Sequence, residues 1–255
     1  MDYSIAISVV IPCYNEENNL KRGVLEQVYD YLNKQKYKWE VIVANDASSD
    51  NSLKLVEKFV KKHPGFSVLD LPHGGKPSAV YAGIKKAKYG YILFTDMDQS
   101  TPISELAKLI PYLGKNEVII GSRGIFRNGN SLIRKLGSLV FLNFRRLIIL
   151  PKIIDTQCGF KVIKTEVAKK IFPHLSFFKE NITGGWRVSA FDAEMLFMAQ
   201  KWGYKIKEIP VIWQDEDISN TKGNKTKSYL KESLQMVKEI WRIKINDLGG
   251  KYEKN

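Results

Sequence analysis

The amino-terminal half of the chain alternates apolar runs with runs of helical pattern, and this alternation limits the folds that are open to it. The apolar runs are short and rich in β-branched residues, as buried strands are. Strands that alternate with helices form parallel sheets with right-handed crossovers. The order therefore predicts an α/β fold with a mostly parallel, doubly wound sheet. We expect strands at Ile5–Ile11, Trp39–Ala44, Phe66–Leu71 and Tyr91–Thr95, and helices at Glu17–Gln35, Ser52–Lys62 and Pro77–Lys88.

The second half of the chain is less regular, and no linker in it marks a second domain. Helices are expected at Ser104–Tyr112, Ser131–Leu150, from Thr165 onward, Asp192–Lys201 and Lys225–Ile245, and strands at Val118–Gly121, Lys161–Ile163 and Ile206–Trp213. We expect one large domain over residues 1–215. An amphipathic helix and tail over residues 216–255 should follow it, packed on the domain or at a membrane interface.

The chain of 255 residues carries a formal net charge of +13, which predicts an anionic partner such as nucleic acid, a nucleotide or acidic lipid. No nucleic-acid recognition motif or stacking platform is evident, so we expect no nucleic-acid partner. The two cysteines, Cys13 and Cys158, give no disulfide framework and fit a reducing compartment. The sequence shows no signal peptide and no run of the roughly 18 to 20 apolar residues that a membrane-spanning helix needs. We therefore expect a cytoplasmic or membrane-surface protein.

Polar and acidic residues follow the predicted strands, at the edge where doubly wound sheets bind their ligands. The most informative group is Asp96-Met97-Asp98, directly after the strand Tyr91–Thr95. Two carboxylates that flank one residue can hold a hard divalent cation against a diphosphate. Aspartates after strands are also common turn formers, so the tripeptide alone leaves both roles open. Polar groups follow the other strands at Pro12–Glu16, Asn45-Asp46 and Leu71–His73.

Three segments together resemble the family 2 glycosyltransferases, which have the GT-A fold. They are Pro12–Glu16, Asn45–Asp50 and Asp96–Asp98. In that family the three motifs fall at the ends of successive strands, in this order and at about this spacing. The resemblance extends from Val9 to about Ile245. It implies the GT-A fold and the transfer of a sugar from a nucleotide-sugar donor.

The resemblance also implies which residues bind the nucleotide. Asp46 matches the family aspartate that reads the base edge, and the family often has glycine where this chain has Ala47. We therefore expect a turn that needs no positive φ at this place. Lys76 follows two glycines and precedes a predicted helix, where it is either a phosphate contact or a solvated turn lysine. The residues that shape the pocket after the first strand are Pro12, Tyr14, Asn15 and Glu16, of which the last two can also begin a helix.

Asp96 and Asp98 take the metal role in this resemblance. The family's carboxylates hold Mg²⁺ or Mn²⁺, which bridges both donor phosphates and stabilises the leaving nucleoside diphosphate. Asp96 therefore belongs to the nucleotide-sugar site as well as to the metal site.

The second half resembles a narrower branch, the dolichyl- or polyprenyl-phosphate glucosyl and mannosyl transferases. The heptad Asp155–Lys161 and the run Phe191–Leu196 look most like the dolichyl-phosphate β-glucosyltransferases. The branch implies that Arg123 and Arg134 hold the acceptor phosphate, with Ser138 as a hydroxyl partner. The implied reaction is the inverting transfer of a hexose, glucose favoured, from UDP-glucose to a polyprenyl or dolichyl phosphate. The implied catalytic residues are Asp96, Asp98, Arg123 and Asp192.

Other functions stay open at this point. One is a family 2 transferase with a hydroxyl acceptor in surface polysaccharide synthesis, for which Asp192 would be the base. Another is a polyprenyl-phosphate mannosyltransferase that uses GDP-mannose. A third is a non-catalytic binding module, against which the intact pair Asp96 and Asp98 argues, because binding alone needs no metal clamp.

The stretch from Glu117 to Asp155 has no acidic residue between its ends and carries Arg145 and Arg146 among many apolar residues. A basic, apolar helix suits the interface of an anionic membrane, with arginines toward phosphates. A core helix with a solvated basic rim is the alternative. We expect peripheral attachment at the inner face of the cell membrane. The helix Tyr229–Ile245 is a second interfacial element or a core helix.

Overall fold

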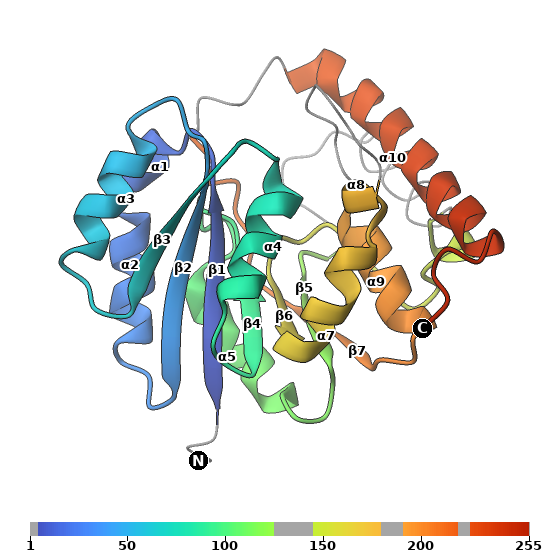
Figure 1. Ribbon diagram of the computed structural model, residues 1–255, viewed down its shortest axis with the longest axis horizontal. Coiled ribbons are helices and arrows are strands. Elements are labelled where there is room, and N and C mark those ends of the chain that lie inside the picture. Colours follow the sequence, from blue (N-terminus) through green and yellow to red (C-terminus); the bar gives the residue numbers. More distant parts are fainter. Residues whose placement is uncertain (1–4, 125–144, 180–190, 219–224, 255) are drawn as a thin grey trace. The chain divides into compact units, whose positions relative to one another are not determined.

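The structure, a computed structural model, describes residues 5–124, 145–179, 191–218 and 225–254 (Figure 1). For residues 179 and 225–234 it describes the main chain only. The chain forms two compact units, and each is described by itself. Unit 1 comprises Met1–Pro111, Gly159–Lys170 and Ile212–Lys222, and unit 2 comprises Tyr112–Cys158, Ile171–Val211 and Gly223–Asn255. The boundary expected between residues 215 and 216 stays a prediction.

The sheet of unit 1 has the strand order β3-β2-β1-β4-β6. β1 runs parallel to β2 and β4, β2 runs parallel to β3, and only β6 is antiparallel, against β4. This confirms the predicted α/β fold with a mostly parallel sheet. Because β1, β2 and β4 are parallel, their carboxyl ends meet at one edge, and the three sequence motifs meet there too. The strands are β1 Ala6–Cys13, β2 Lys38–Asp46, β3 Phe66–Leu71, β4 Tyr91–Phe94 and β6 Lys161–Lys164.

The helices of unit 1 connect these strands as predicted, with one correction. The single helix expected over Glu17–Gln35 is wrong, because the chain forms two helices that are separated at Gly23, whose φ is 82°. Glycine adopts this left-handed conformation without the steric cost that a Cβ would bring. The helical segments are α1 Glu17–Lys21, α2 Val24–Leu32, α3 Ser52–Val60, α4 Lys76–Lys86, the short turns Ile103–Glu105, Leu106–Leu109 (α5) and Ile110–Tyr112, and α7 Thr165–Ile171.

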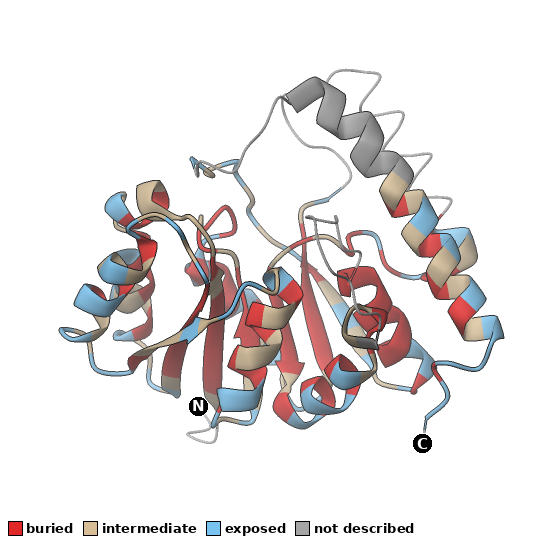
Figure 2. Ribbon diagram, turned by 45° about the horizontal axis from the view of Figure 1, so that its top comes forward, coloured by how far each residue is buried: buried red, intermediate tan, exposed pale blue. Residues whose placement is uncertain are grey.

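The core of unit 1 is made by the central strands and the inner faces of their helices, which are red in Figure 2. In β1, Ile7, Val9 and Val10 are fully buried. α4 packs on β1 and β2, as Figure 1 also shows. This approach requires a glycine at position 83, because a Cβ there would lie 2.3 Å from Cγ1 of Val10.

Unit 2 contains a parallel strand pair and several helices. The strands are β5 Val118–Ser122 and β7 Ile206–Pro210. The strand expected over Ile206–Trp213 therefore ends early, at a proline, which has no N–H to donate to the ladder. The helices are the turn Phe172–His174, α8 Ser176–Lys179, α9 Phe191–Lys201 and α10 Lys225–Leu248.

Arg145 corrects part of the interfacial-helix prediction. Most of the expected helix Ser131–Leu150 lies outside the described residues, but Arg145 is described and is 3% exposed. Its guanidinium donates to Thr156 Oγ1 at 2.8 Å and to the main-chain oxygen of Ile154 at 2.6 Å. Burial lowers the pKa of Arg145 to about 10. This arginine therefore supports the start of the heptad inside unit 2 and does not face a membrane.

Candidate active site

The loops that follow β1 and β2 are joined by hydrogen bonds within unit 1. The amide of Asn15 donates to Ser48 Oγ at 3.1 Å, and Asn15 Oδ1 accepts from the amide of Ser49 at 2.8 Å. The amide of Glu16 donates to Ser52 Oγ at 2.7 Å. Asn15 itself has a φ of 55°, a region that asparagine tolerates better than most residues. The predicted nucleotide-binding residues after Pro12 thus lie on a loop that is held in place by hydrogen bonds to the loop after β2.

Ala47 overturns one expectation about the second motif. Its φ is 54°, so the turn does need a positive φ although the chain carries no glycine here. For a residue with a Cβ this conformation costs roughly 1 to 2 kcal/mol. The hydrogen bonds around the two loops offset that cost.

Asp46 organises the loop that precedes α4. Its carboxylate accepts from the amide of Gly74 at 2.7 Å and from the amide of Gly75 at 2.9 Å. His73 Nδ1 lies 3.0 Å from the same carboxylate, and the His73 ring lies 4.9 Å from the Tyr14 ring. The predicted base-reading aspartate is therefore also the residue that brings this loop beside Tyr14.

Lys76 and Asp96 form an ion pair, with 2.6 Å between Lys76 Nζ and Asp96 Oδ1. Asp98 Oδ1 accepts from the amide of Ser100 at 2.8 Å. Burial, and then the neighbouring Asp96 charge, raise the pKa of Asp98 above its ordinary value. The tripeptide thus concentrates negative charge in a partly buried place, and a cation there would offset it.

Glu16 adds a third carboxylate to this environment. Burial raises its pKa to about 7, and the hydrogen bond from Asn19 opposes this rise. The negative charges of Asp217, Asp98 and Asp96 add to it. Four acidic side chains of unit 1 therefore influence one another electrostatically, which is the setting that a bound cation stabilises.

Asp96 and Asp98 fit a divalent metal by their chemistry. In the described part of the chain, no group of three or more His, Cys, Asp or Glu side chains is arranged to hold a metal ion. Two carboxylates suffice for a magnesium-type site, since substrate phosphates and water supply the remaining oxygens. Burial, and then the charge of Asp96, disfavour the ionised form of Asp98, and a bound cation would favour it.

In unit 2, Arg123 is held by the first residue of the heptad. Arg123 Nε donates to Asp155 Oδ2 at 2.7 Å and Arg123 Nη2 donates to Asp155 Oδ1 at 2.8 Å. Such a two-point pair fixes the plane of the guanidinium. Glu208 on β7 supports it by accepting from the amide of Asp155 at 2.7 Å. The guanidinium of Arg123 is thus already oriented by Asp155. Its contact with an acceptor phosphate stays a prediction.

Asp192 and Glu194 lie in the first turn of α9, and both are buried. Glu194 is fully engaged inside unit 2, where its Oε1 accepts from the amide and the hydroxyl of Ser176 and from the hydroxyl of Tyr252. Glu194 therefore attaches the C-terminal tail to α9. The catalytic role of Asp192 stays a prediction.

The sequence comparisons identify the family. The model of the family described as glycosyl transferase family 2 matches residues 8–172, which is more than half of the chain. The chain belongs to glycosyl transferase family 2. It is a glycosyltransferase.

Two relatives of this glycosyltransferase are similar over most of its length. A dolichyl-phosphate β-glucosyltransferase from Dictyostelium discoideum is 31% identical, over 97% of this chain and 76% of its own. The relative of the same name from Saccharomyces cerevisiae is 30% identical, over 100% of this chain and 78% of its own.

Solved structures confirm the GT-A fold. Glucosyl-3-phosphoglycerate synthase from Mycobacterium tuberculosis, solved with Mn²⁺, UDP-glucose and phosphoglyceric acid, matches with a TM-score of 0.61. Its sequence is 12% identical, and the match covers 93% of this chain and 79% of that one. At this identity the likeness shows the fold alone.

The glycosyltransferase brings its predicted donor residues together in unit 1. Arg123 and Asp192 are described in unit 2, whereas Arg134 and Ser138 lie outside the described residues. The donor residues of unit 1 are Pro12, Tyr14, Asn15, Glu16, Asp46, Lys76, Asp96 and Asp98.

Sequence reasoning missed several residues around the donor motifs of this glycosyltransferase. Gly159 lies against the Asp96 carboxylate, and Arg22 donates to the main-chain oxygen of Asp98. Asp217 influences the charge of Glu16. Two features of the sequence could have pointed to them: the acidic run Gln214–Asp217 and the glycine of the heptad.

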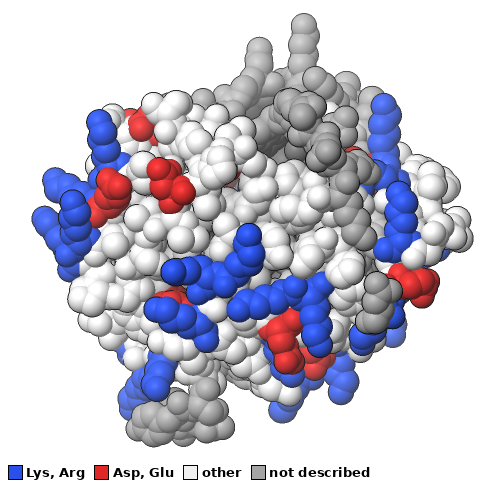
Figure 3. All heavy atoms as spheres, viewed as in Figure 1, with Lys and Arg blue, Asp and Glu red and all other residues white. Residues whose placement is uncertain are grey.

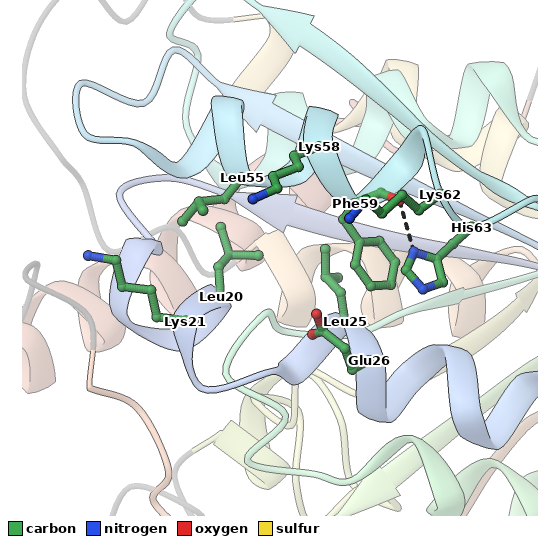
Figure 4. Close-up of a pocket in the computed structure, with 9 residues that line it drawn as sticks. All are labelled: Leu20, Lys21, Leu25, Glu26, Leu55, Lys58, Phe59, Lys62 and His63. Atoms are coloured by element: carbon green, nitrogen blue, oxygen red, sulfur yellow. Dashed lines mark hydrogen bonds between the residues drawn. The ribbon is translucent and has the colours of Figure 1, made fainter.

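Unit 1 also has a pocket of about 370 Å³ among α1, α2 and α3 (Figure 4). Its wall combines two buried leucines, one half-buried leucine and a buried phenylalanine with exposed lysines at the rim, and none of the predicted site residues belongs to it. The lining residues are Leu20, Lys21, Leu25, Glu26, Leu55, Lys58, Phe59, Lys62 and His63.

A helix that crosses a bilayer must be both long and apolar. In the described ranges, no helix combines the length and the hydrophobicity needed to cross a membrane.

Proposed function

We propose that this glycosyltransferase transfers a hexose, with glucose favoured, from a nucleotide-sugar to a polyprenyl or dolichyl phosphate, with inversion at the anomeric carbon. The observation that carries the proposal is the similarity, over nearly the whole chain, to two proteins named dolichyl-phosphate β-glucosyltransferase. The heptad Asp155–Lys161 supports the same branch. UDP-glucose is the favoured donor.

On the donor side, Asp96 and Asp98 would hold Mg²⁺ or Mn²⁺. When bound, the metal supplies Lewis-acid stabilisation to the departing nucleoside diphosphate. Lys76 is close enough to share the diphosphate charge, since its Nζ already lies 2.6 Å from Asp96 Oδ1. Pro12, Tyr14, Asn15, Glu16 and Asp46 shape the nucleotide pocket around the loops described above.

On the acceptor side, Arg123 and Arg134 hold the lipid phosphate, with Ser138 as a hydroxyl partner. A phosphate is already an anion at neutral pH, so it can attack without a strong general base. The protein then contributes mainly orientation, for which the two-point bond between Arg123 and Asp155 prepares the guanidinium. Asp192 is a carboxylate that orients acceptor-side groups.

The enzyme contacts the inner face of an anionic membrane peripherally. Support comes from the net charge of +13 and from Figure 3, where Lys and Arg are more widespread than Asp and Glu on the face shown. α10 adds an apolar stripe, because Trp241, Ile245 and Leu248 are 48%, 63% and 78% exposed and share one face of the helix. Exposed apolar residues with lysines nearby suit the interfacial region of a bilayer.

The test is a donor screen with paired acceptors. Undecaprenyl phosphate and undecaprenol, which lacks the phosphate, are offered with UDP-glucose, GDP-mannose and UDP-GlcNAc in the presence of Mn²⁺. We expect release of the nucleoside diphosphate only with UDP-glucose and undecaprenyl phosphate, and a β-linked lipid product by NMR. Release with undecaprenol but not with undecaprenyl phosphate would establish a hydroxyl acceptor instead.

A further inference from the structure

The side chain of Arg22 joins two parts of unit 1 that are far apart in the sequence. Arg22 Nη2 donates to the main-chain oxygen of Asp98 at 2.6 Å. Arg22 Nη1 donates to Glu216 Oε2 at 2.7 Å. Arg22 and Glu216 are partly shielded, with side chains 27% and 44% exposed. One guanidinium thus links the Asp96–Asp98 motif to the segment 212–218, which follows β7 in the chain.

The segment 212–218 is also attached to the loop after Asp98. The amide of Gln214 donates to the main-chain oxygen of Ser100 at 2.8 Å, and the amide of Glu216 donates to Ser100 Oγ at 3.3 Å. Ser100 in turn donates its own amide to the Asp98 carboxylate. The main-chain oxygen and the carboxylate of Asp98 are therefore both held by groups that the segment 212–218 contacts.

The same segment reaches the first nucleotide motif through Asn19. Asn19 is fully buried, and its Nδ2 donates to Glu16 Oε2 at 2.6 Å and to Asp217 Oδ1 at 3.2 Å. The amide of Ile218 donates to Asn19 Oδ1 at 3.4 Å. The segment 212–218 therefore connects Glu16 with Asp98, two residues of the donor site that lie on different loops.

Arg22 binds Asp98 in a way that leaves its carboxylate oxygens to other partners. It contacts the main-chain oxygen, and that bond orients the peptide that joins Asp98 to Gln99, whose φ is 52°. A left-handed residue here costs free energy and persists only where neighbouring groups hold it. The arginine also places a positive charge beside the acidic side chains of this site.

We propose that Arg22 is a positioning residue for the donor site, which clamps the segment 212–218 to the main chain of Asp98 and so sets the direction of the Asp98 carboxylate. The inference rests on the proposed role of Asp98 in binding the metal and the donor diphosphate. Arg22 acts through Asp98 and through Glu216, and it contacts no reacting atom itself.

The experiment compares Arg22→Ala with Lys21→Ala. Lys21 is the preceding residue, carries the same charge and pairs with Glu17 on the surface, so it is a matched control. Binding of the nucleoside diphosphate that the wild type prefers, UDP or GDP, is measured with Mn²⁺ by calorimetry. We expect Arg22→Ala to raise Kd about tenfold to a hundredfold, as for loss of a charged hydrogen bond. Lys21→Ala should bind as the wild type does.

Two further measurements separate positioning from a general loss of structure. Arg22→Lys can keep one of the two bonds, so it should restore part of the affinity. The KM for the nucleotide-sugar should rise in Arg22→Ala while the KM for the lipid phosphate stays within about twofold. Glu216→Gln replaces the charged partner of Arg22 with a neutral amide and should also raise Kd, so it tests the clamp even if Arg22→Ala fails to fold.

Two outcomes would overturn the inference: unchanged Kd in both Arg22→Ala and Glu216→Gln, or equal losses toward donor and acceptor. Asp98→Asn, measured in parallel, distinguishes this failure from that of the proposed function. If Asp98→Asn loses nucleotide–Mn²⁺ affinity and both Arg22→Ala and Glu216→Gln keep it, only the clamp is wrong. If neither loses affinity, the donor role of Asp98 is wrong as well.

Discussion

The main chain of Gly159 touches the carboxylate of Asp96. A Cβ at position 159 would lie 2.0 Å from Asp96 Oδ2 and 2.6 Å from its Cγ, so no larger residue leaves that carboxylate where it is. Gly159 belongs to the heptad that carries the resemblance to dolichyl-phosphate β-glucosyltransferases. The heptad therefore also shapes the predicted metal site of unit 1.

Gly159→Ala should displace the Asp96 carboxylate. Because that side chain is 41% exposed, it can move aside, and we expect only a small loss of thermal stability. Nucleotide–Mn²⁺ affinity, measured by calorimetry, should fall about tenfold or more, since charge-assisted contacts contribute roughly 1.5 to 3 kcal/mol. Gly90→Ala is the control, because a Cβ there meets nothing within 4 Å. Equal affinities for the two variants would contradict the proposed contact.

Asp98→Asn should separate activity from stability. Metal chemistry contributes several kcal/mol to such transfers, so turnover should fall about a hundredfold or more. Burial and the charge of Asp96 disfavour the ionised Asp98, so the neutral asparagine should not lower the free energy of unfolding at pH 8. EDTA should abolish wild-type turnover reversibly. Asp30→Asn, an exposed residue of α2, is the control. Full turnover in excess EDTA would remove the metal from the mechanism.

Glu16 should make the metal-free protein less stable as the pH rises. Its pKa is about 7 in the folded chain against an ordinary 4.5, so between these values the folded state binds more protons than the unfolded state. The free energy of unfolding therefore falls through this window as the pH increases, by about 1 to 3 kcal/mol. Glu16→Gln should remove this loss. The free energy of unfolding of the variant should therefore exceed that of the wild type at pH 8 and equal it near pH 4.5. Urea unfolding at both pH values checks this, with the exposed Glu26→Gln as control.

Tyr252→Phe should weaken the attachment of the C-terminal tail without affecting the donor site. The Tyr252 hydroxyl donates to Glu194 Oε1 inside unit 2. Loss of one hydrogen bond to a buried carboxylate should cost about 1 to 3 kcal/mol in the free energy of unfolding. Nucleotide–Mn²⁺ affinity should stay at the wild-type value. Unchanged stability would show that Glu194 finds sufficient partners without the tail.

The exposed stripe of α10 should contribute to membrane binding. Replacing Trp241 and Ile245 with serine should lower co-sedimentation with anionic liposomes, and the loss should depend little on salt because it removes apolar burial. Ile212→Ser is the control, since Ile212 is 54% exposed but lies in unit 1. If the wild type remains in the supernatant at low salt, the peripheral attachment is wrong.

The local features of the donor half were readable from the sequence. Strand and helix periods are local properties of a chain, so β3 was predicted at its observed bounds and the other strands to within a few residues. The carboxyl ends of parallel strands lie at the same edge of a sheet. Asp46 and Asp96, which follow two such predicted strands, could therefore be expected to lie near each other. Ala47 shows the limit of such reasoning, because its φ is positive although it is not a glycine.

The contacts that orient the donor motifs were decided by the tertiary structure alone. Arg22 is separated from Asp98 by 76 positions in the sequence and from Glu216 by 194. The periodicity of a single strand or helix carries no information about contacts between such distant residues. Gly159 lies on a late segment that returns to pack beside β4, and only its approach to Asp96 explains the missing side chain. The sequence by itself determined the α/β fold and the residue types at its strand ends, because both follow from nearby residues. Tertiary structure decided which distant groups hold those residues in place, because packing joins segments that are remote along the chain.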